Sequence, residues 1–251
     1  MIGLCDGDVA LYRAGYAAEK KVKRQLDSGD IEHIREVAPE SHAIQNLRTV
    51  MESLENKFSK IEVFLSGSNN FRKNVATIKP YKGNRSPFQR PVHYEALRQF
   101  LIDKYRATVS DGCEADDDIG IRATDGCDGC IVSTDKDLRQ IKGKHYNWVR
   151  DEWSEVDERE GLRVFYRQML TGDATDNIPG IEGVGPVNSS LIVDPFTKEK
   201  GMWQAVKAEW HLRYPKGYES GGKVYAVDEV LAELGSLLWI QRTNRIRWEA
   251  P

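Results

Sequence analysis

Four groups of acidic side chains occur where a predicted strand ends or a predicted helix begins. They are Asp6; Glu114, Asp116 and Asp117; Asp135 and Asp137; and Asp173 and Asp176. Carboxylates packed together repel one another unless cations neutralise them. Hard divalent ions with oxygen ligands, Mg²⁺ or Mn²⁺, fit this donor chemistry best. Two such ions about 3.5–4 Å apart can clamp the attacking and leaving oxygens of a phosphodiester.

A basic segment lies between the first and second of these acidic groups. The sequence from Val63 to Tyr94 contains no acidic residue. Its bases are Arg72, Lys73, Lys79, Lys82, Arg85 and Arg90, and its aromatic residues include Tyr81 and Phe88. Prolines and a glycine interrupt the segment, which predicts an irregular and mobile arm. One acidic cluster alone is most simply a solvated loop or a helix cap, but four clusters and a basic arm favour metal and polyanion binding.

Composition narrows the class of protein. The chain has 251 residues, of which 40% are hydrophobic and 30% are charged, with a net charge of −3. This describes a globular protein with one large domain or two small ones, and not a disordered chain. No apolar run reaches the ~20 residues of a membrane helix. Four cysteines and an N-terminus unlike a secretion signal predict a reducing cytoplasm.

Alternating strands and helices predict how the acidic groups meet. Strands are expected at 2–5, 61–65, 107–110 and 131–133, with helices at 9–18, 42–58, 91–103 and 115–123. Such alternation is typical of an α/β fold, with a mostly parallel sheet flanked by helices. Residues 19–40 are expected to form an exposed excursion. Functional sites lie outside the carboxyl ends of such strands, so three acidic groups should share one edge. Asp173 and Asp176 would align on one face if that segment is helical.

The character of the sequence changes near residue 150. Helical patterns at 161–170, 202–210 and 227–245 surround a glycine-rich stretch at 172–185. We therefore expect an α/β core at 1–150, with a basic arch at about 67–90, and a helical C-terminal lobe at 151–251.

Five ordered motifs resemble those of structure-specific 5′ nucleases. The motifs are Asp6-Gly-Asp8, Tyr81-Lys-Gly-Asn-Arg85, Glu114-Ala-Asp-Asp117, Thr134-Asp-Lys-Asp-Leu138 and Gly172-Asp-Ala-Thr-Asp-Asn-Ile-Pro-Gly180. This family includes the 5′-nuclease domain of bacterial DNA polymerase I, flap endonucleases and bacteriophage 5′→3′ exonucleases. The length of the chain is most similar to the phage enzymes. The resemblance covers residues 1–192.

The resemblance implies a PIN-like core and a helical lobe that contains a helix–three-turn–helix. It implies that all eight carboxylates above hold two Mg²⁺ ions, for which Mn²⁺ can substitute. It makes Lys82 and Arg85 catalytic residues in a gateway that contacts the scissile phosphate. The remaining implied DNA-binding residues are Arg72, Lys73, Lys79, Tyr81, Gly180, Gly183 and Gly185. The three glycines belong to a turn whose amides and a bound K⁺ hold duplex phosphates.

The implied activity is Mg²⁺-dependent 5′→3′ exonuclease or flap endonuclease cleavage of DNA, with RNA in hybrids as a further substrate. The implied partners are DNA 5′ ends, flaps and nicks, for a monomer that acts in the bacterial host cytoplasm and not at a membrane. Two departures from the family pattern stand out. Ser66 replaces an aspartate that often follows the second strand, and Pro186-Val-Asn188 replaces basic residues after the glycine-rich turn.

Two other functions are compatible with parts of the sequence. Asp6-Gly-Asp8 and Gly172-Asp-Ala-Thr-Asp176 also match motifs of haloacid-dehalogenase-type phosphatases. In that class a hydrophobic strand precedes the second motif, whereas residues 165–170 here have a helical pattern. A non-catalytic DNA-junction binder is the other alternative, and Ser66 is the only feature that favours it.

Overall fold

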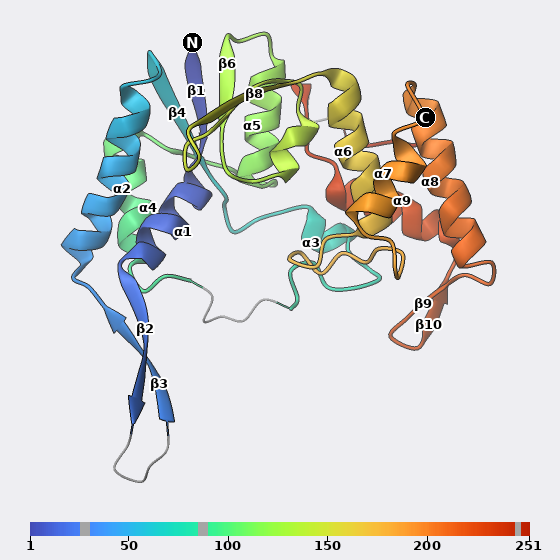
Figure 1. Ribbon diagram of the computed structural model, residues 1–251, viewed down its shortest axis with the longest axis horizontal. Coiled ribbons are helices and arrows are strands. Elements are labelled where there is room, and N and C mark those ends of the chain that lie inside the picture. Colours follow the sequence, from blue (N-terminus) through green and yellow to red (C-terminus); the bar gives the residue numbers. More distant parts are fainter. Residues whose placement is uncertain (26–30, 85–89, 244–246) are drawn as a thin grey trace.

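The computed structural model describes residues 1–25, 31–84, 90–243 and 247–251. A six-stranded sheet lies at its centre, in the order β5-β4-β1-β6-β7-β8 (Figure 1). The strands are β1 (Ile2–Asp6), β4 (Lys60–Leu65), β5 (Thr108–Val109), β6 (Gly129–Val132), β7 (Gly143–Asn147) and β8 (Glu152–Val156). The first five are parallel, and β8 runs antiparallel to β7. The predicted α/β fold with a mostly parallel sheet is confirmed.

Helices cover both faces of the sheet. Successive side chains of β1 point to opposite faces, and each face packs against its own set of helices. Cys5 belongs to a core with α1 (Gly7–Ala17), α2 (Glu40–Glu55) and α4 (Tyr94–Tyr105). Leu4 belongs to a second core with α5 (Ala115–Thr124). Both side chains are fully buried. The carboxyl end of β1 is therefore fixed between two packed layers.

A helical lobe follows the sheet, with its own core. It contains α6 (Glu158–Thr171), α7 (Pro186–Val193), α8 (Glu199–Arg213), α9 (Val227–Leu238) and a hairpin of β9 (Tyr218–Ser220) and β10 (Lys223–Tyr225). Phe165, Trp210 and Leu234 are among its buried residues. The short helix α3 (Arg72–Val75), from the basic arm, packs against α9. The helix expected at 227–245 ends at Leu238.

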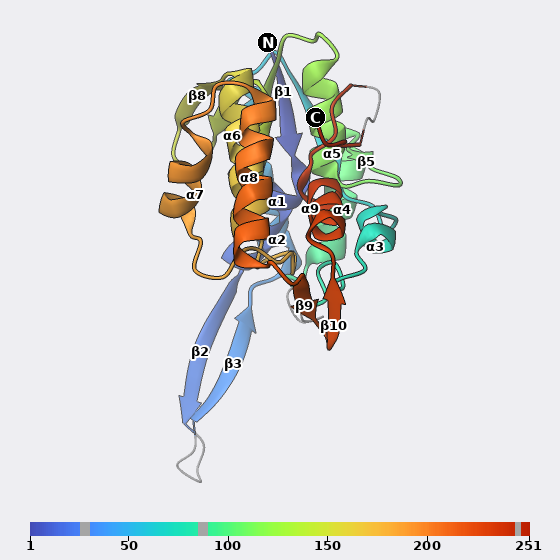
Figure 2. The same ribbon diagram turned by 90° about the vertical axis from the view of Figure 1, so that its right-hand side faces the viewer.

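Two parts of the fold differ from the sequence-based expectation. Residues expected as an excursion form a two-stranded ribbon of β2 (Glu19–Gln25) and β3 (Ile31–Val37), which projects from the body in both views (Figures 1 and 2). Its base is anchored, because Val92 N–H donates to Glu19 Oε1 at 2.6 Å. The sheet also gains β7 and β8, so its last strand lies beyond residue 150.

None of the helices in the described ranges is both long and apolar enough to span a membrane. All four cysteines are free thiols.

Candidate active site

Asp6 ends β1 and caps α1. Its Oδ1 accepts a hydrogen bond of 3.0 Å from Val9 N–H, and its Oδ2 accepts one of 2.8 Å from the Ser133 hydroxyl. The side chain is 2% exposed. Burial, and then the charge of Asp8, raise the pKa of Asp6 to about 7. A carboxylate this costly to ionise suits a site where a cation compensates its charge.

The N-terminus of α5 brings a second acidic group to the same edge. Glu114 is the N-cap residue, and Asp116 lies in the first turn. Burial raises the pKa of Asp116 well above its ordinary value, and the charges of Asp6 and Asp135 add to this effect. The groups after β1, before α5 and after β6 are therefore near enough to repel one another.

The third group follows β6. Asp135 Oδ1 accepts a hydrogen bond of 2.8 Å from Asp137 N–H, and Gln168 Nε2 donates to Asp137 Oδ1 at 2.6 Å. Burial, followed by the charges of Asp135 and Asp173, raises the pKa of Asp137 to about 7. Burial also raises the pKa of Asp135, and Asp173 and Asp176 contribute. The charges of the fourth acidic group thus raise the pKa values of the third group.

The fourth group lies on a tight turn and not on a helix, which corrects the helical alternative considered for Asp173 and Asp176. Asp173 and Ile178 exchange backbone hydrogen bonds of 3.0 and 2.8 Å. Asp173 Oδ1 accepts a hydrogen bond of 2.7 Å from Thr175 N–H. These local hydrogen bonds replace a helical ladder.

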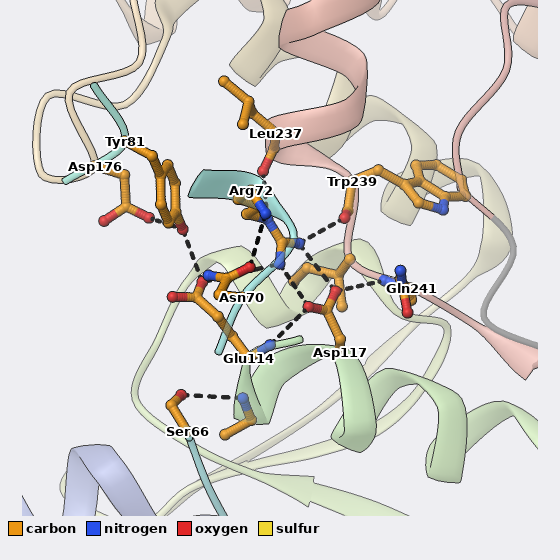
Figure 3. A network of polar contacts seen from close by, with 12 residues as sticks. Ser66, Asn70, Arg72, Tyr81, Glu114, Asp117, Asp176, Leu237, Trp239 and Gln241 are labelled. Atoms are coloured by element: carbon orange, nitrogen blue, oxygen red, sulfur yellow. Dashed lines mark hydrogen bonds and ion pairs between the residues drawn. The ribbon is translucent and has the colours of Figure 1, made fainter. Parts of the chain in front are cut away.

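Tyr81 and Lys82 of the basic arm reach into the acidic groups. The Tyr81 hydroxyl contacts Glu114 Oε2 at 2.7 Å and Asp176 Oδ2 at 2.8 Å (Figure 3). Lys82 Nζ pairs with Glu114 and lies 3.7 Å from Asp176 Oδ2. Burial alone would raise the pKa of Glu114, but Lys82 and then Arg72 hold it below its ordinary value. Lys82 is thus the local counter-charge of this carboxylate.

Backbone and amide hydrogen bonds fasten this part of the arm to the acidic turn. Lys82 N–H donates to Asp176 O at 2.8 Å, and Asn84 Nδ2 donates to Ala174 O at 2.7 Å. Asn177 Nδ2 donates to Pro80 O at 2.9 Å. Lys82 adopts a positive φ of 56°, which is uncommon for a residue other than glycine. Arg85, the other predicted catalytic residue, lies outside the described residues.

A cavity of about 630 Å³ opens at this edge of the sheet. Acidic lining residues include Asp6, Glu114, Asp116 and Asp135, and basic ones include Lys73, Lys82, Arg90 and Arg98. Lys79 is half-buried and does not line it. The cavity therefore offers both cations and carboxylates to a bound phosphate group.

The sequence-based list omitted Asp8, although it lines the cavity. Ser66 N–H donates to Asp8 Oδ2 at 2.9 Å, and Ser66 Oγ accepts a hydrogen bond of 3.1 Å from Ala115 N–H. Burial raises the pKa of Asp8. The Asp6-Gly-Asp8 spacing was the available signal.

Arg98 was also omitted, and it also lines the cavity. Its Nη1 is buried without a hydrogen-bond partner in the described part of the chain. No sequence motif marked this arginine, which lies on α4 beyond the basic arm.

Arg72 and Asp117 do not lie where the sequence predicts. Arg72 is 3% exposed and Asp117 is 0% exposed, and they form a buried ion pair. Arg72 is therefore not available to bind DNA, and Asp117 is not available to bind a metal ion. The physical reason is that each satisfies the other's charge inside the protein.

The donor chemistry fits divalent cations. All the candidate ligands are carboxylates, whose oxygens Mg²⁺ and Mn²⁺ prefer. Burial, and then repulsion by neighbouring carboxylates, raises the pKa values of Asp6, Asp116, Asp135 and Asp137, and a bound cation would compensate their charge. In the described ranges, no three acidic, histidine or cysteine side chains are already gathered around one point. The side chains would have to close around an ion.

The glycine-rich stretch joins α6 to α7. Gly180 packs against the end of α6, where an added Cβ would lie 2.2 Å from the carbonyl carbon of Thr171. Gly183 has a φ of +78°, and an added Cβ at Gly183 or Gly185 would meet open space. The backbone here is therefore accessible next to the N-terminus of α7, a suitable environment for an anion.

Residues 1–167 match the family described as "5'-3' exonuclease, N-terminal resolvase-like domain". The chain belongs to this family. It is 26% identical to a 5'-3' exonuclease of Buchnera aphidicola subsp. Schizaphis graminum over 221 residues, which cover 81% of the chain and 73% of the relative. It is 25% identical to an exonuclease of Escherichia phage T7 over 270 residues, covering 95% of the chain and 87% of the relative.

This 5′-3′ exonuclease family protein also resembles part of a larger polymerase and a solved phage structure. It is 31% identical to DNA polymerase I of Rhizobium leguminosarum over 153 residues, or 53% of the chain, but these span only 15% of that polymerase. A solved bacteriophage T5 flap endonuclease complex with DNA and metal ions superposes with a TM-score of 0.57 at 16% identity. That match covers 94% of the chain and 85% of the T5 chain, and it supports the fold.

Proposed function

We propose that this protein hydrolyses DNA phosphodiester bonds near 5′ ends, as a 5′→3′ exonuclease and flap endonuclease that uses two Mg²⁺ ions. One observation carries the proposal. Three of the four acidic groups line a cavity whose wall also carries Lys82 and Tyr81, and the fourth group adds to their mutual repulsion through Asp135. Family membership supports the same conclusion.

Seven carboxylates would hold the ions, with Mn²⁺ as a substitute. They are Asp6, Glu114, Asp116, Asp135, Asp137, Asp173 and Asp176. When bound, such ions supply positive charge that stabilises the attacking and leaving oxygens of a phosphodiester. Asp117 is not included, because its oxygens are already occupied by Arg72 and by backbone groups.

Lys82 supplies positive charge from the chain itself. Its ammonium pairs with Glu114, so it must exchange that contact for a phosphate oxygen when substrate enters. A cation fixed where negative charge develops lowers the barrier of the chemical step. Burial, followed by Glu114 and Asp176, raises the pKa of Tyr81, so its hydroxyl stays protonated and can donate to an anion. Arg85 would act beside Lys82.

The remaining contacts would position the DNA. Lys73 and Lys79 would contact phosphates on the arm. The backbone around Gly180, Gly183 and Gly185 would hold the duplex with a K⁺ ion, as part of a helix–three-turn–helix. The substrates would be 5′ ends, flaps and nicks, with RNA in hybrids as a further substrate. The protein would act as a monomer in the host cytoplasm.

The structure argues against the phosphatase alternative. A helix, α6, precedes Gly172 and Asp173, where a phosphatase of the haloacid-dehalogenase type would have a strand. A non-catalytic binder would gain nothing from repelling carboxylates beside DNA phosphates.

Cleavage of end-labelled substrates with and without Mg²⁺ tests the proposal. The substrates are a 5′ flap, a nicked duplex, a recessed 5′ end and an RNA–DNA hybrid, and Asp135→Asn is the matched inactive variant. We expect Mg²⁺-dependent products from the wild type and none from the variant. Binding without cleavage at any Mg²⁺ or Mn²⁺ concentration would instead identify a junction binder.

A further inference from the structure

A buried ion pair links the basic arm to helix α5. Arg72 Nη1 donates to Asp117 Oδ2 at 2.5 Å, and Nη2 donates to Oδ1 at 2.9 Å (Figure 3). This bidentate geometry is the strongest form of an arginine–carboxylate contact. Breaking such a pair leaves an uncompensated charge in the interior. Neither side chain can therefore move away alone.

Arg72 also binds the segment Leu237–Arg242, which we call the C-terminal strap. Its Nε donates to Leu237 O at 2.8 Å, and its Nη2 donates to Trp239 O at 2.8 Å (Figure 3). Leu237 lies in the last turn of α9, where carbonyl groups lack partners within the helix. The guanidinium thus caps α9 while it neutralises Asp117.

Asp117 connects the C-terminal strap to Glu114. Its Oδ1 accepts a hydrogen bond of 3.0 Å from Gln241 N–H, and its Oδ2 accepts one of 3.1 Å from Glu114 N–H. With the two contacts from Arg72, each carboxylate oxygen accepts two hydrogen bonds, which uses its lone-pair sites. Asp117 therefore fixes the backbone of Glu114, whose side chain lines the cavity.

Gly120 allows the C-terminal strap to lie directly on α5. A Cβ at this position would come within 2.3 Å of Gln241 O and 2.9 Å of Ile240 Cγ2. Any larger residue would push the two segments apart.

A second chain of contacts joins the C-terminal strap to another acidic group. Gln140 Nε2 donates to Leu238 O at 2.9 Å and to Gln168 Oε1 at 2.7 Å. Gln168 Nε2 in turn donates to Asp137 Oδ1 at 2.6 Å. The strap is thus connected to the acidic residues of α5 and to those after β6.

We propose that the C-terminal strap positions the acidic cavity, through Arg72 and Asp117 on one side and through Gln140 and Gln168 on the other. Arg72 is a positioning residue and not a DNA contact. The activity readout rests on the proposed nuclease function, whereas the docking of the strap does not.

The main test removes both charges with Arg72→Met/Asp117→Leu. Buried pairs are often tolerated as apolar replacements, so the variant should fold. We expect the half-saturating Mg²⁺ concentration to rise and the single-turnover rate to fall, by about 10–100-fold, as for other residues that orient metal ligands. Affinity for DNA in EDTA should not change. Amide hydrogen exchange should accelerate together at residues 114–117 and 237–241.

Two single variants sharpen the test. Arg72→Lys keeps the charge but lacks the planar fork, so it should resemble the double variant. Arg122→Met is the matched control, because Arg122 lies on the same helix and pairs with Glu62 and Asp125. It should leave Mg²⁺ dependence and exchange at 237–241 unchanged.

If the double variant does not fold, Gly120→Ala displaces the C-terminal strap without removing a charge, and we expect the same changes as in the double variant.

Two results would overturn the positioning role. The first is unchanged Mg²⁺ dependence and unchanged exchange in the variants. The second is weaker DNA binding in EDTA with a salt slope reduced by about one, which would make Arg72 a phosphate contact. The wild type could also fail to cleave any substrate while amide exchange at 114–117 and 237–241 still accelerates together in the variants. In that case the positioning role stands and the proposed function is wrong.

Discussion

Ser66 N–H donates a hydrogen bond of 2.9 Å to Asp8 Oδ2, so a carboxylate from the start of α1 lies at the end of β4. Ser66 stands where the family pattern often has an aspartate. The structure therefore supplies an acidic group at this position from another segment. Asp8 lies in the first turn of α1, and the hydrogen bond from Ser66 N–H holds its carboxylate in the wall of the cavity.

We expect Asp8→Asn to weaken divalent-ion binding by about 10–100-fold, because it removes one charge beside the metal ligands. Isothermal titration with Mn²⁺ and the Mg²⁺ dependence of cleavage measure the effect. The exchange variant Asp8→Ser/Ser66→Asp should recover part of the affinity. An Asp8→Asn protein with wild-type titrations would exclude this carboxylate from the site.

Metal-free protein should lose stability as the pH rises from about 4 to about 7. The pKa values of Asp6 and Asp137 are raised from 3.8 to about 7 in the folded state. Between these values the folded state binds more protons than the unfolded state, so each unit of rising pH favours unfolding. Thermal unfolding in EDTA at pH 5 and pH 7.5 measures this. Mg²⁺ should raise the melting temperature more at pH 7.5, where the carboxylates are ionised; an equal effect at both pH values would contradict the prediction.

Lys82→Ala should lower the single-turnover cleavage rate by about 10²–10³-fold with saturating enzyme. The reason is that the ammonium lies at the acidic cavity, where a phosphodiester would gain charge during attack. The dissociation constant for DNA should change much less. Single-turnover rates across an enzyme titration separate the two effects, and recovery of the full rate at saturation would place Lys82 in binding only.

Arg98→Ala should weaken DNA binding and reduce the salt slope by about one unit. Arg98 lines the cavity, and its buried Nη1 lacks a hydrogen-bond partner among the residues that the structure describes. A phosphate oxygen would satisfy this donor. Arg48→Ala, on α2 with its guanidinium over the Phe100 ring, is the control and should leave the slope unchanged. An unchanged slope in both variants would show that Arg98 does not contact DNA.

Sequence periodicity predicted the sheet because β1, β4 and β6 are buried runs bounded by turns and helices. It placed Asp6, Glu114 and Asp135 correctly because the carboxyl ends of parallel strands share an edge. The β2–β3 ribbon gave no such signal, since charged residues make up much of its sequence. The Arg72–Asp117 contact could not be predicted from the sequence either, because charge and residue type alone cannot distinguish a buried arginine from one that binds phosphate.

The contacts of the C-terminal strap also set an order of events during synthesis of the chain. Asp117 leaves the ribosome well before Gln241, the residue that completes its hydrogen bonds. At about 5–20 residues per second, this interval is roughly 6 to 25 seconds. The strands that carry the acidic residues can pair during that time, but Arg72 has no carbonyl partners from α9 to fix it. Under the proposed positioning role, a nascent chain would therefore hold its acidic residues in the right order and still cleave DNA more slowly than the finished protein.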